Sequence, residues 1–437
     1  MCAKRLDFLT VAGGRIVDEA GRPVHLCGAN LGAWLMWEGY LFGIPNVAES
    51  VLREELAARC GPERTEALFR GVLDHFAGPE DFARARALGM NVLRLPFHHR
   101  WVELDGGKWI DRAVRWAAEA GVYVILDMHA VPGGQNPSWH ADAAGEAGFW
   151  KSEAHQDEFV RLWRVLAERY ALESAVAGYD VMNEPILSDT ELPRMDRVYR
   201  RAVEAIRESD PRHVIILEED QGRKNFDNLS GECGPNVCYS YHTYTQPEGT
   251  VERRAAYRAV IREHGVPLYC GEHDIWALLD EFRAECVHWT WWPYLRSSAD
   301  TWGHPLVTCG GEAWRRFVLG TRSGLARYAG RIRSLIDAAE LPGSIRAQAN
   351  AAFEERGVEI AYDRTLGRIL YSDPEVVWRP LIAGVNHLWA RSFAEAAAEV
   401  PEPELAAAVA SLAGREVTEH GRRLAGILGA SGVRRPG

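Results

Sequence analysis

The stretch VAGYDVMNEP, residues 176–185, joins an apolar run of strand type to a polar pair at its end. The apolar residues favour a buried strand, and Pro185 ends the pattern directly after Asn183 and Glu184. In a parallel α/β barrel, catalytic side chains stand at the C-terminal ends of the strands, which is where this carboxylate would lie. An N-cap for a following helix would also explain a polar pair, since Asn is common at that position. A carboxylate at a second strand end would decide between the two interpretations.

Seven further apolar runs have the length and composition of strands, and helical patterns separate most of them. They are the run that ends in GANLGAWLMWE (28–38) and residues 91–97, 122–130, 213–221, 237–244, 267–274 and 286–294. Eight short strands separated mostly by helices predict an α/β fold with parallel strands, a (β/α)8 TIM barrel. A doubly wound open sheet is the alternative, but it would normally carry a Gly-rich phosphate loop, and the sequence has no GxGxxG.

Additional segments flank the eight strands. Residues 14–27 alternate around a turn at 19–21, which predicts an N-terminal β-hairpin. We assign residues 1–340 to the barrel and 341–437 to a C-terminal α-helical extension packed on or near it. The extension is rich in Ala, Glu and Arg, with helical patterns near 344–356, 374–399 and 402–429 and a hairpin pattern at 358–371. An appendage, a lid over the strand ends and an oligomerisation surface all remain open as its role.

The composition is that of an ordinary globular protein with 47% hydrophobic and 25% charged residues. A formal net charge of −11 argues against nucleic acid as the main partner. We expect no membrane span, because no run of 18 apolar residues occurs. The N-terminus lacks the apolar core of a secretory signal, so a cytoplasmic location is expected unless a leader is missing. The eight cysteines show no paired CxxC spacing, so no metal and no cofactor are expected. The oligomeric state stays open.

Two carboxylates stand at predicted strand ends in a way that suits one reaction. Glu184 ends the fourth strand, and Glu272 ends the seventh within CGEHD (270–274). Opposed glutamates across a barrel mouth suit glycoside hydrolysis, in which one protonates the leaving oxygen and the other attacks the anomeric carbon. We interpret the polar residues at the end of the fifth strand as the beginning of a solvated loop from which one member could reach the site: they are Glu218, Glu219 and Asp220.

Seven motifs follow one another along the chain: GRPVHLCGANLGAWLMWE (21–38), NVLRLPF (91–97), DMHAVPGGQN (127–136), NEP (183–185), HTY (242–244), CGEHD (270–274) and HWTWWPY (288–294). In this order, over about residues 10–295, they resemble glycoside hydrolase family 5, a family of retaining barrel glycosidases. The nearest likeness is to its exo-β-1,3-glucanase and β-glucosidase branch. Ala33, Ala130 and Val131 depart from the family pattern, and the C-terminal extension has no counterpart in it, which leaves the substrate open.

The resemblance implies a retaining β-glycosidase that cleaves β-glucosidic bonds by double displacement, with Glu184 as acid/base and Glu272 as nucleophile. Further residues would bind the sugar or support the two glutamates: Glu38, Arg94, His129, Asn183, His242, Tyr244 and Trp292. By the same resemblance, Arg94 and Tyr244 would hold Glu272, and His242 would lie near Glu184. Asn183 would bind the sugar 2-hydroxyl and His129 the sugar at the cleavage subsite. Trp292 would form the floor of that subsite, and Glu38 would bind a hydroxyl at its far end.

The expected substrates are carbohydrates, either β-glucosides or short β-glucans. The same chemistry on β-mannosides, or on a glycolipid of the glucosylceramide type, is the alternative. A non-catalytic carbohydrate-binding barrel is a second class, although a pure binder has no use for a nucleophile held by Arg94 and Tyr244. A metal-dependent barrel hydrolase would need a His-x-His pair on the first strand and a bridging lysine, and the sequence has neither. A retaining mechanism predicts carboxyl groups about 5–5.5 Å apart.

Overall fold

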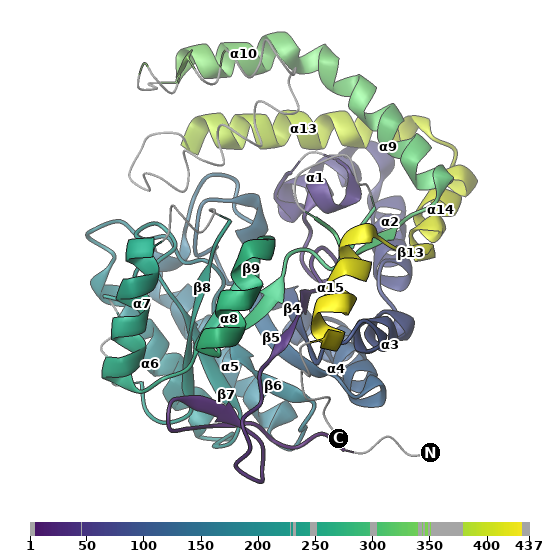
Figure 1. The fold of residues 1–437 in the computed structure, drawn as a ribbon. Coiled ribbons are helices and arrows are strands. Elements are labelled where there is room, and N and C mark those ends of the chain that lie inside the picture. Colours follow the sequence, from purple (N-terminus) through teal and green to yellow (C-terminus); the bar gives the residue numbers. More distant parts are fainter. Residues whose placement is uncertain are drawn as a thin grey trace.

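Eight parallel strands close into a barrel that helices surround (Figure 1). Around the barrel their order is β10-β3-β4-β5-β6-β7-β8-β9. The computed structural model describes residues 5–430 apart from 45, 228, 230–232, 245–250, 298–303, 340–342, 344–345, 348–349 and 351–378. The barrel strands are Cys27–Asn30 (β3), Val92–His98 (β4), Tyr123–Ala130 (β5), Val176–Asp180 (β6), Val214–Glu218 (β7), Val237–His242 (β8), Leu268–His273 (β9) and His288–Trp291 (β10). The (β/α)8 fold expected from the apolar runs is therefore confirmed.

The barrel strands are buried along their whole length, which is why they read as apolar runs without polar alternation. Close approach of neighbouring strands restricts residue size in at least one place. Gly28 of β3 faces Val92 of β4 in the register of this pair. A Cβ atom on Gly28 would lie 1.7 Å from the Val92 carbonyl oxygen, so only glycine fits there.

Helices cover the outside of the barrel: Pro79–Ala87 (α3), Lys108–Ala120 (α4), Glu153–Tyr170 (α5), Pro193–Arg207 (α6), Val251–His264 (α7) and Leu279–Glu285 (α8). Two more, Glu49–Cys60 (α1) and Pro62–His75 (α2), are inserted between β3 and α3. Each helix turns an apolar stripe inward. In α4 the buried residues recur at helical spacing: Trp109, Ile110, Ala113, Val114 and Ala117.

The N-terminal hairpin lies earlier in the chain than its sequence pattern suggested. Thr10–Ala12 (β1) pairs antiparallel with Arg15–Val17 (β2) around Gly13 and Gly14, which both take a positive φ. The expected turn at 19–21 does form, but beyond it only one bridge follows, between Val17 and Pro23. Pro23 has no N–H to donate, and its two neighbours carry the pairing: the Asp18 N–H donates to the Arg22 carbonyl at 3.0 Å, and the Val24 N–H donates to the Ile16 carbonyl at 2.9 Å. Leu9 and Ile16 belong to an apolar cluster at the N-terminal ends of the barrel strands.

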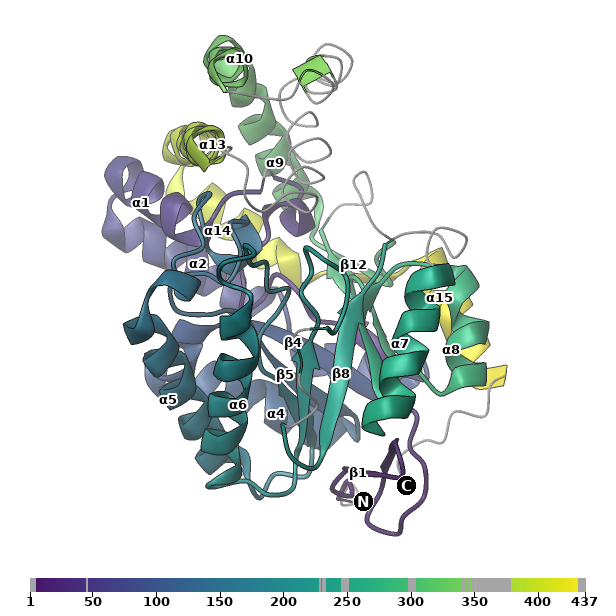
Figure 2. The ribbon, with the colours of Figure 1, turned by 90° about the vertical axis from the view of Figure 1, so that its left-hand side faces the viewer.

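The chain after β10 packs beside the first barrel helices and returns to the barrel. It forms Leu295–Arg296 (β11), Val307–Cys309 (β12), Glu312–Leu325 (α9), Ala329–Ala338 (α10), Arg379–Glu399 (α13), Glu402–Ala410 (α14), Arg415–Val417 (β13) and Glu419–Ala430 (α15). Figures 1 and 2 show α13 alongside α1, with α10 further out, and α14 near α2. β13 pairs antiparallel with β12, and Arg415 forms an ion pair with Asp81 of α3 at 2.7 Å.

The helical pattern at 402–429 is not one helix, because β13 interrupts it. Gly414 precedes the strand, and Thr418 follows it, where its hydroxyl accepts a hydrogen bond from the Gly421 N–H at the start of α15. The pattern at 374–399 is helical from Arg379 onward. The hairpin pattern at 358–371, and most of 344–356, lie outside the described residues. How the chain divides into domains stays a prediction.

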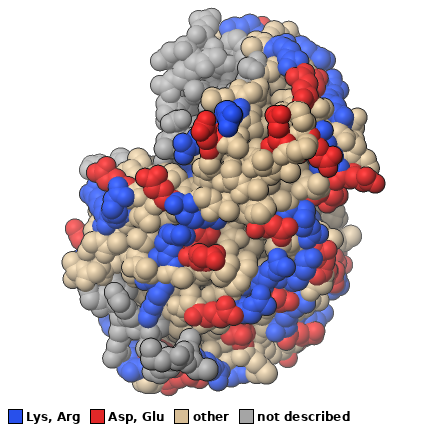
Figure 3. Space-filling view, turned by 90° about the vertical axis from the view of Figure 1, so that its right-hand side faces the viewer, with Lys and Arg blue, Asp and Glu red and all other residues tan. Residues whose placement is uncertain are grey.

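One face of the molecule carries side chains of both charges. The face drawn in Figure 3 carries acidic and basic side chains interspersed rather than one continuous basic area. Within the described part of the chain, no helix has both the length and the apolar character needed to cross a bilayer.

Candidate active site at the strand ends

The nine residues named from the sequence meet at the C-terminal end of the barrel, and we call them the strand-end cluster. They are Glu38 after β3, Arg94 on β4, His129 on β5, Asn183 and Glu184 after β6, His242 at the end of β8, Tyr244 beyond it, Glu272 on β9 and Trp292 after β10. Parallel strands bring these positions together because all their C-terminal ends lie on one face. All are buried except Tyr244, which is partly exposed.

Arg94 is the central cation of the cluster, and its side chain is completely buried. Its Nε donates to Asp180 Oδ2 at 2.8 Å, and its Nη1 donates to Glu272 Oε1 at 2.9 Å. Its Nη2 donates to Asn183 Oδ1 and to Glu218 Oε1, each at 2.9 Å. Burial opposes the charge, but the surrounding carboxylates raise the pKa of Arg94 well above its usual value. A guanidinium is suited to this position because its planar fork can hold several oxygens at once.

Glu272 is held by two donors from different strands. Arg94 donates to its Oε1, and the Tyr244 hydroxyl donates to its Oε2 at 2.7 Å. Both oxygens of this carboxylate are therefore fixed in direction, and one of the two donors carries a positive charge. This is the environment that a carboxylate nucleophile requires.

Glu184 has different partners. Its Oε1 accepts a hydrogen bond from Gln221 Nε2 at 2.8 Å and lies 2.8 Å from His242 Nδ1. Its Oε2 lies 3.6 Å from His140 Nε2. Burial would raise the pKa of Glu184, but the hydrogen bond and the charge of His242 outweigh it and lower that pKa. Burial would lower the pKa of His242, but the charges of Glu218 and Glu272 raise it well above its usual value. The pKa shifts of the two groups are opposite in direction, so one proton is held between His242 Nδ1 and Glu184 Oε1, which lie 2.8 Å apart.

The two glutamates stand close together across the mouth of the barrel. One ligand atom from each of Glu184, His242 and Glu272 lies within 4.8 Å of the other two. Carboxyl groups about 5–5.5 Å apart suit a retaining glycosidase, whereas inverting enzymes need about 6.5–9.5 Å to admit a water molecule. One oxygen of each carboxylate lies within 4.8 Å of the other, which is nearer to the first case than to the second.

The same three groups are also near enough to ligate a cation. The oxygens of both glutamates, however, already accept hydrogen bonds from Arg94, Tyr244 and Gln221. A metal ion would have to compete with these donors and would lie beside the buried guanidinium charge. The surroundings of the glutamates therefore favour acid/base and nucleophilic roles over metal binding.

The far side of the cluster offers polar groups beside flat rings. The rings of His129 and Trp292 are nearly parallel, at 8°, with centroids 6.0 Å apart. His129 Nδ1 lies 2.7 Å from Asp127, and the Trp292 indole N–H donates to the Tyr40 hydroxyl. Burial, followed by the charge of Glu272, raises the pKa of Glu38 well above its usual value.

Three buried polar atoms in the cluster have no hydrogen-bond partner among the described residues. They are Nδ2 of Asn183, Oε1 of Glu38 and Nε2 of His242, the last of which has only an ion-pair contact, with Glu218 Oε1 at 3.1 Å. Leaving a buried polar atom without a partner costs about 1–3 kcal/mol. A ligand with several hydroxyl groups would satisfy the atoms of Asn183 and Glu38, because a hydroxyl both donates and accepts.

The sequence interpretation missed several residues of the site. Glu218, Glu219 and Asp220 do not begin a solvated loop, because their side chains are at most 2% exposed. They are buried because Glu218 binds Arg94, Glu219 accepts from Tyr257 on α7, and Asp220 binds Arg223. Other unnamed contributors to the site are Tyr40, His140 and Gln221.

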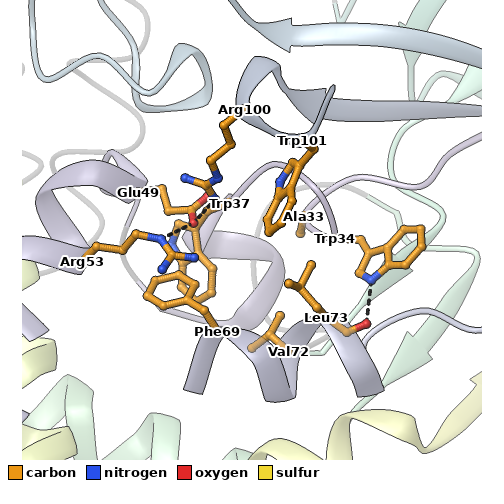
Figure 4. Close-up of a pocket in the computed structure, with 10 residues that line it drawn as sticks. All are labelled: Ala33, Trp34, Trp37, Glu49, Arg53, Phe69, Val72, Leu73, Arg100 and Trp101. Carbon is orange, nitrogen blue, oxygen red and sulfur yellow. Dashed lines mark hydrogen bonds and ion pairs between the residues drawn. The ribbon is translucent and has the colours of Figure 1, made fainter. Parts of the chain in front are cut away.

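A separate cavity lies between α1, α2 and the 3-10 turn His99–Val102 (Figure 4). It is only about large enough for a single water molecule, and none of its lining residues belongs to the strand-end cluster. Glu49 lies at its edge and pairs with Arg53 at 2.7 Å and with Arg100. The indole N–H groups of Trp37 and Trp101 have no partner among the described residues, so an ordered water is the simplest occupant.

A closed parallel barrel with two buried glutamates at this separation defines a class of protein, the barrel glycoside hydrolases. The chain belongs to glycosyl hydrolase family 5. The model of this family, which is described as cellulase, matches residues 74–303. The resemblance drawn from the seven motifs is thereby confirmed.

Two curated relatives illustrate the range within the family. A β-xylosidase of Phanerodontia chrysosporium is 35% identical over 277 residues, which is 59% of this chain and 58% of that protein. A glucan 1,3-β-glucosidase of Pichia angusta is 25% identical over 238 residues, covering 50% of this chain and 54% of that protein. The chain thus spans a little over half the length of the curated relatives it matches.

Solved structures agree on the fold. The crystal structure of an endogalactoceramidase matches with a TM-score of 0.51 at 24% identity, covering 67% of this chain and 76% of that one. At this identity the likeness concerns the fold alone.

Proposed function

We propose that the protein is a retaining β-glycosidase that hydrolyses β-glucosidic bonds, with Glu184 as acid/base and Glu272 as nucleophile. The observation that carries the proposal is the pair itself. Its oxygens approach within 4.8 Å, and the two carboxylates have unlike partners, Arg94 and Tyr244 for one and His242 and Gln221 for the other. Two carboxylates in unlike surroundings are what a double displacement needs.

The first step forms a covalent glycosyl-enzyme. Glu272 attacks the anomeric carbon, the bond to the leaving oxygen breaks, and that oxygen takes the proton held by the Glu184–His242 pair. Water then attacks the anomeric carbon, its proton passes to the same pair, and the ester bond to Glu272 breaks. Two inversions give net retention of configuration. Asn183 and Glu38, each with an unpartnered buried atom, would bind sugar hydroxyls, and Trp292 and His129 would lie against the ring.

β-Glucosides or short β-glucans are the proposed substrates, and the glucan 1,3-β-glucosidase relatives support them. The β-xylosidase relative favours β-xylosides as a second candidate, because it is more similar to this chain. β-Mannosides and glucosylceramide stay as expectations from the sequence. The intracellular location also stays a proposal, which cell fractionation would test.

The test is hydrolysis of nitrophenyl β-glucoside, β-xyloside and β-mannoside under one set of conditions. Proton NMR of the first product formed should show the β-anomer before mutarotation, as retention requires. An α-anomer as the first product would contradict the proposal, and so would sugar binding without hydrolysis of any of the three glycosides.

Treatment with EDTA is expected to leave nitrophenyl β-glucoside hydrolysis unchanged within error. The reason is that Arg94, Tyr244 and Gln221 occupy the carboxylate oxygens that a metal would need. The measurement is the initial rate before and after dialysis against EDTA, with added Mg²⁺, Ca²⁺ and Zn²⁺ as controls. Loss of activity that a cation restores would contradict this expectation and revive a metal-dependent mechanism.

A further inference from the structure

Glu218, the last residue of β7, contacts the proposed acid/base at two points. Its Oε2 accepts a hydrogen bond from the backbone N–H of Glu184 at 2.7 Å. Its Oε1 lies 3.1 Å from His242 Nε2, on the side of the imidazole away from Glu184. The Glu218 side chain is 2% exposed, so these contacts are shielded from water. One carboxylate thus reaches both the backbone and the side-chain partner of Glu184.

The backbone contact matters because Glu184 has a strained conformation. Its φ is +44°, in the left-handed region that a residue with a side chain seldom adopts. Such a conformation persists only where neighbouring groups fix it. The Glu218 hydrogen bond to the Glu184 N–H fixes it from the strand-7 side, while Asn136 Nδ2 donates to the Glu184 carbonyl at 2.9 Å. The direction in which the Glu184 carboxyl leaves the chain depends on this backbone.

The imidazole contact matters because it fixes the charge of His242. The ring lies between Glu218 on its Nε2 side and Glu184 on its Nδ1 side. Gly271 of β9 packs against the same ring, and a Cβ atom there would lie 2.6 Å from Nε2. The ring therefore cannot move away from the two carboxylates. An anion at Nε2 favours the doubly protonated imidazole, which keeps a proton at Nδ1 next to Glu184.

Other charged and titratable groups surround Glu218 from every neighbouring element. They are Arg94 of β4, Asp127 and His129 of β5, His140 beyond β5, Asp180 of β6, Glu184 after β6, Lys224 after β7 and His242 of β8. Glu272 of β9 lies on the other side of the imidazole, with its Oε2 3.6 Å from His242 Nδ1. Tyr199 of α6 donates only to the backbone carbonyl of Glu218. Asp180 binds Arg94 as Glu218 does, but no hydrogen bond or ion pair joins it to Glu184 or His242. Asp180 is therefore a control: a buried carboxyl group that binds the same arginine but contacts neither Glu184 nor His242.

We propose that Glu218 is a positioning residue for the acid/base, which orients Glu184 through its backbone N–H and keeps a proton on the His242–Glu184 pair. This inference rests on the proposed glycosidase function and adds to it a residue that acts through Glu184 and His242 without touching the reacting atoms. It predicts that losing the Glu218 charge harms proton donation to the leaving group more than attack by Glu272.

The test compares Glu218→Gln with Asp180→Asn on two substrates. Dinitrophenyl β-glucoside has a leaving group that needs no proton, whereas phenyl β-glucoside needs one. For Glu218→Gln we expect kcat/KM to fall by about 10²-fold on phenyl glucoside and by less than about threefold on dinitrophenyl glucoside. The alkaline limb of its pH profile on phenyl glucoside should move to lower pH by about one unit or more, because the imidazolium loses its anion. For Asp180→Asn both substrates should be affected alike, and the alkaline limb should stay in place.

The variant Glu184→Ala distinguishes a failure of the role proposed for Glu218 from a failure of the proposed glycosidase function. It should show the same dependence on leaving group as Glu218→Gln, but more strongly. If wild type is active and Glu184→Ala behaves so, while Glu218→Gln loses equally on both substrates or keeps its alkaline limb, the role of Glu218 is refuted and the glycosidase function stands. If Glu184→Ala retains phenyl glucoside hydrolysis, the proposed function itself is refuted.

Glu218→Asp keeps the inference testable if Glu218→Gln fails to fold, which circular dichroism and thermal melting would show. The shorter side chain keeps the charge but cannot reach both the Glu184 N–H and His242. We expect its alkaline limb to stay within about half a pH unit of wild type, since the anion remains near the ring. The selective loss on phenyl glucoside should persist, and an equal loss on both substrates would again refute the role of Glu218.

Discussion

Replacing Glu272 by Gln is expected to lower kcat on nitrophenyl β-glucoside by on the order of 10⁴-fold or more, as removal of a nucleophile does in other enzymes. The amide keeps the shape of the side chain and can still accept from Tyr244, but it does not attack the anomeric carbon. Because the loss comes from chemistry, the thermal melting temperature should change little compared with the rate. The measurement is the initial rate at saturating substrate.

Glu219→Gln is the matched control for this variant. Glu219 is also a buried glutamate at a strand end, but it accepts a hydrogen bond from Tyr257 on α7 and lies outside the strand-end cluster. We expect its kcat to stay within about tenfold of wild type, because it takes no part in the reaction. Equal losses in Glu219→Gln and Glu272→Gln would show that a buried charge, rather than a nucleophile, had been removed.

A covalent trap gives a second readout for Glu272. A fluoroglucoside with fluorine at the sugar 2-position and a good leaving group should label wild type, because the slowed second step lets the ester accumulate. Mass spectrometry should find the added mass on the peptide that contains Glu272 and none in Glu272→Gln. A label on Glu184 would instead identify Glu184 as the nucleophile and contradict the role proposed for Glu272.

The sequence predicted the barrel well because each barrel strand is buried on both sides. A run such as Tyr123–Ala130 has no polar face, so its apolar character alone marks it as a strand, and its end marks the catalytic face. The strand-end cluster followed from the same logic, since Glu184 and Glu272 directly end such runs. The apolar pattern of the sequence does not predict which hydrogen-bond or ion-pair partner each side chain has.

The row Glu218-Glu219-Asp220 shows where that limit lies. Successive side chains of a strand point to opposite faces, so Glu218 faces Arg94 inside the barrel while Glu219 faces Tyr257 of α7. This alternation was available in the sequence and would have separated the two glutamates. The burial of the two glutamates could not be read from the sequence, because it depends on the Arg94 guanidinium and the Tyr257 hydroxyl, which come from elements far away in the chain.

The predicted structure of the C-terminal extension was partly wrong for a related reason. Residues Arg415–Val417 lie within a helical pattern, yet they form β13 because β12, about a hundred residues earlier, offers a free edge. The Arg415–Asp81 ion pair then fixes this segment to α3. Local propensity carries no information about such a partner.

Replacing Arg94 by Leu is expected to lower the free energy of unfolding by about 3–5 kcal/mol or more, the usual cost of breaking a buried ion pair. Four carboxylates contact this one guanidinium: Asp127, Asp180, Glu218 and Glu272. Without it they face one another in a site closed to water. Glucoside hydrolysis should be lost as well, since Glu272 loses a donor. Urea unfolding followed by tryptophan fluorescence measures the stability.

Arg161→Leu is the control, because Arg161 also pairs with two carboxylates, Glu103 and Glu158, but its side chain is 42% exposed. Water screens these pairs, so the expected cost is about 0–1 kcal/mol. Equal destabilisation by the two substitutions would contradict the role of Arg94 as the counter-charge of the buried carboxylates.

The destabilisation by Arg94→Leu should shrink as the pH falls from 7 to 5. Burial already raises the pKa of Asp127 to about 8 and that of Asp180 well above its usual value in the presence of Arg94, and removal of the guanidinium charge should raise both further. A carboxyl whose pKa is higher in the folded than in the unfolded state binds more protons when folded, so its contribution to stability increases as the pH falls. The variant therefore gains more stability than wild type between pH 7 and 5. A difference between the two proteins that widens over this range would contradict the assignment of Arg94 as the charge that balances the site.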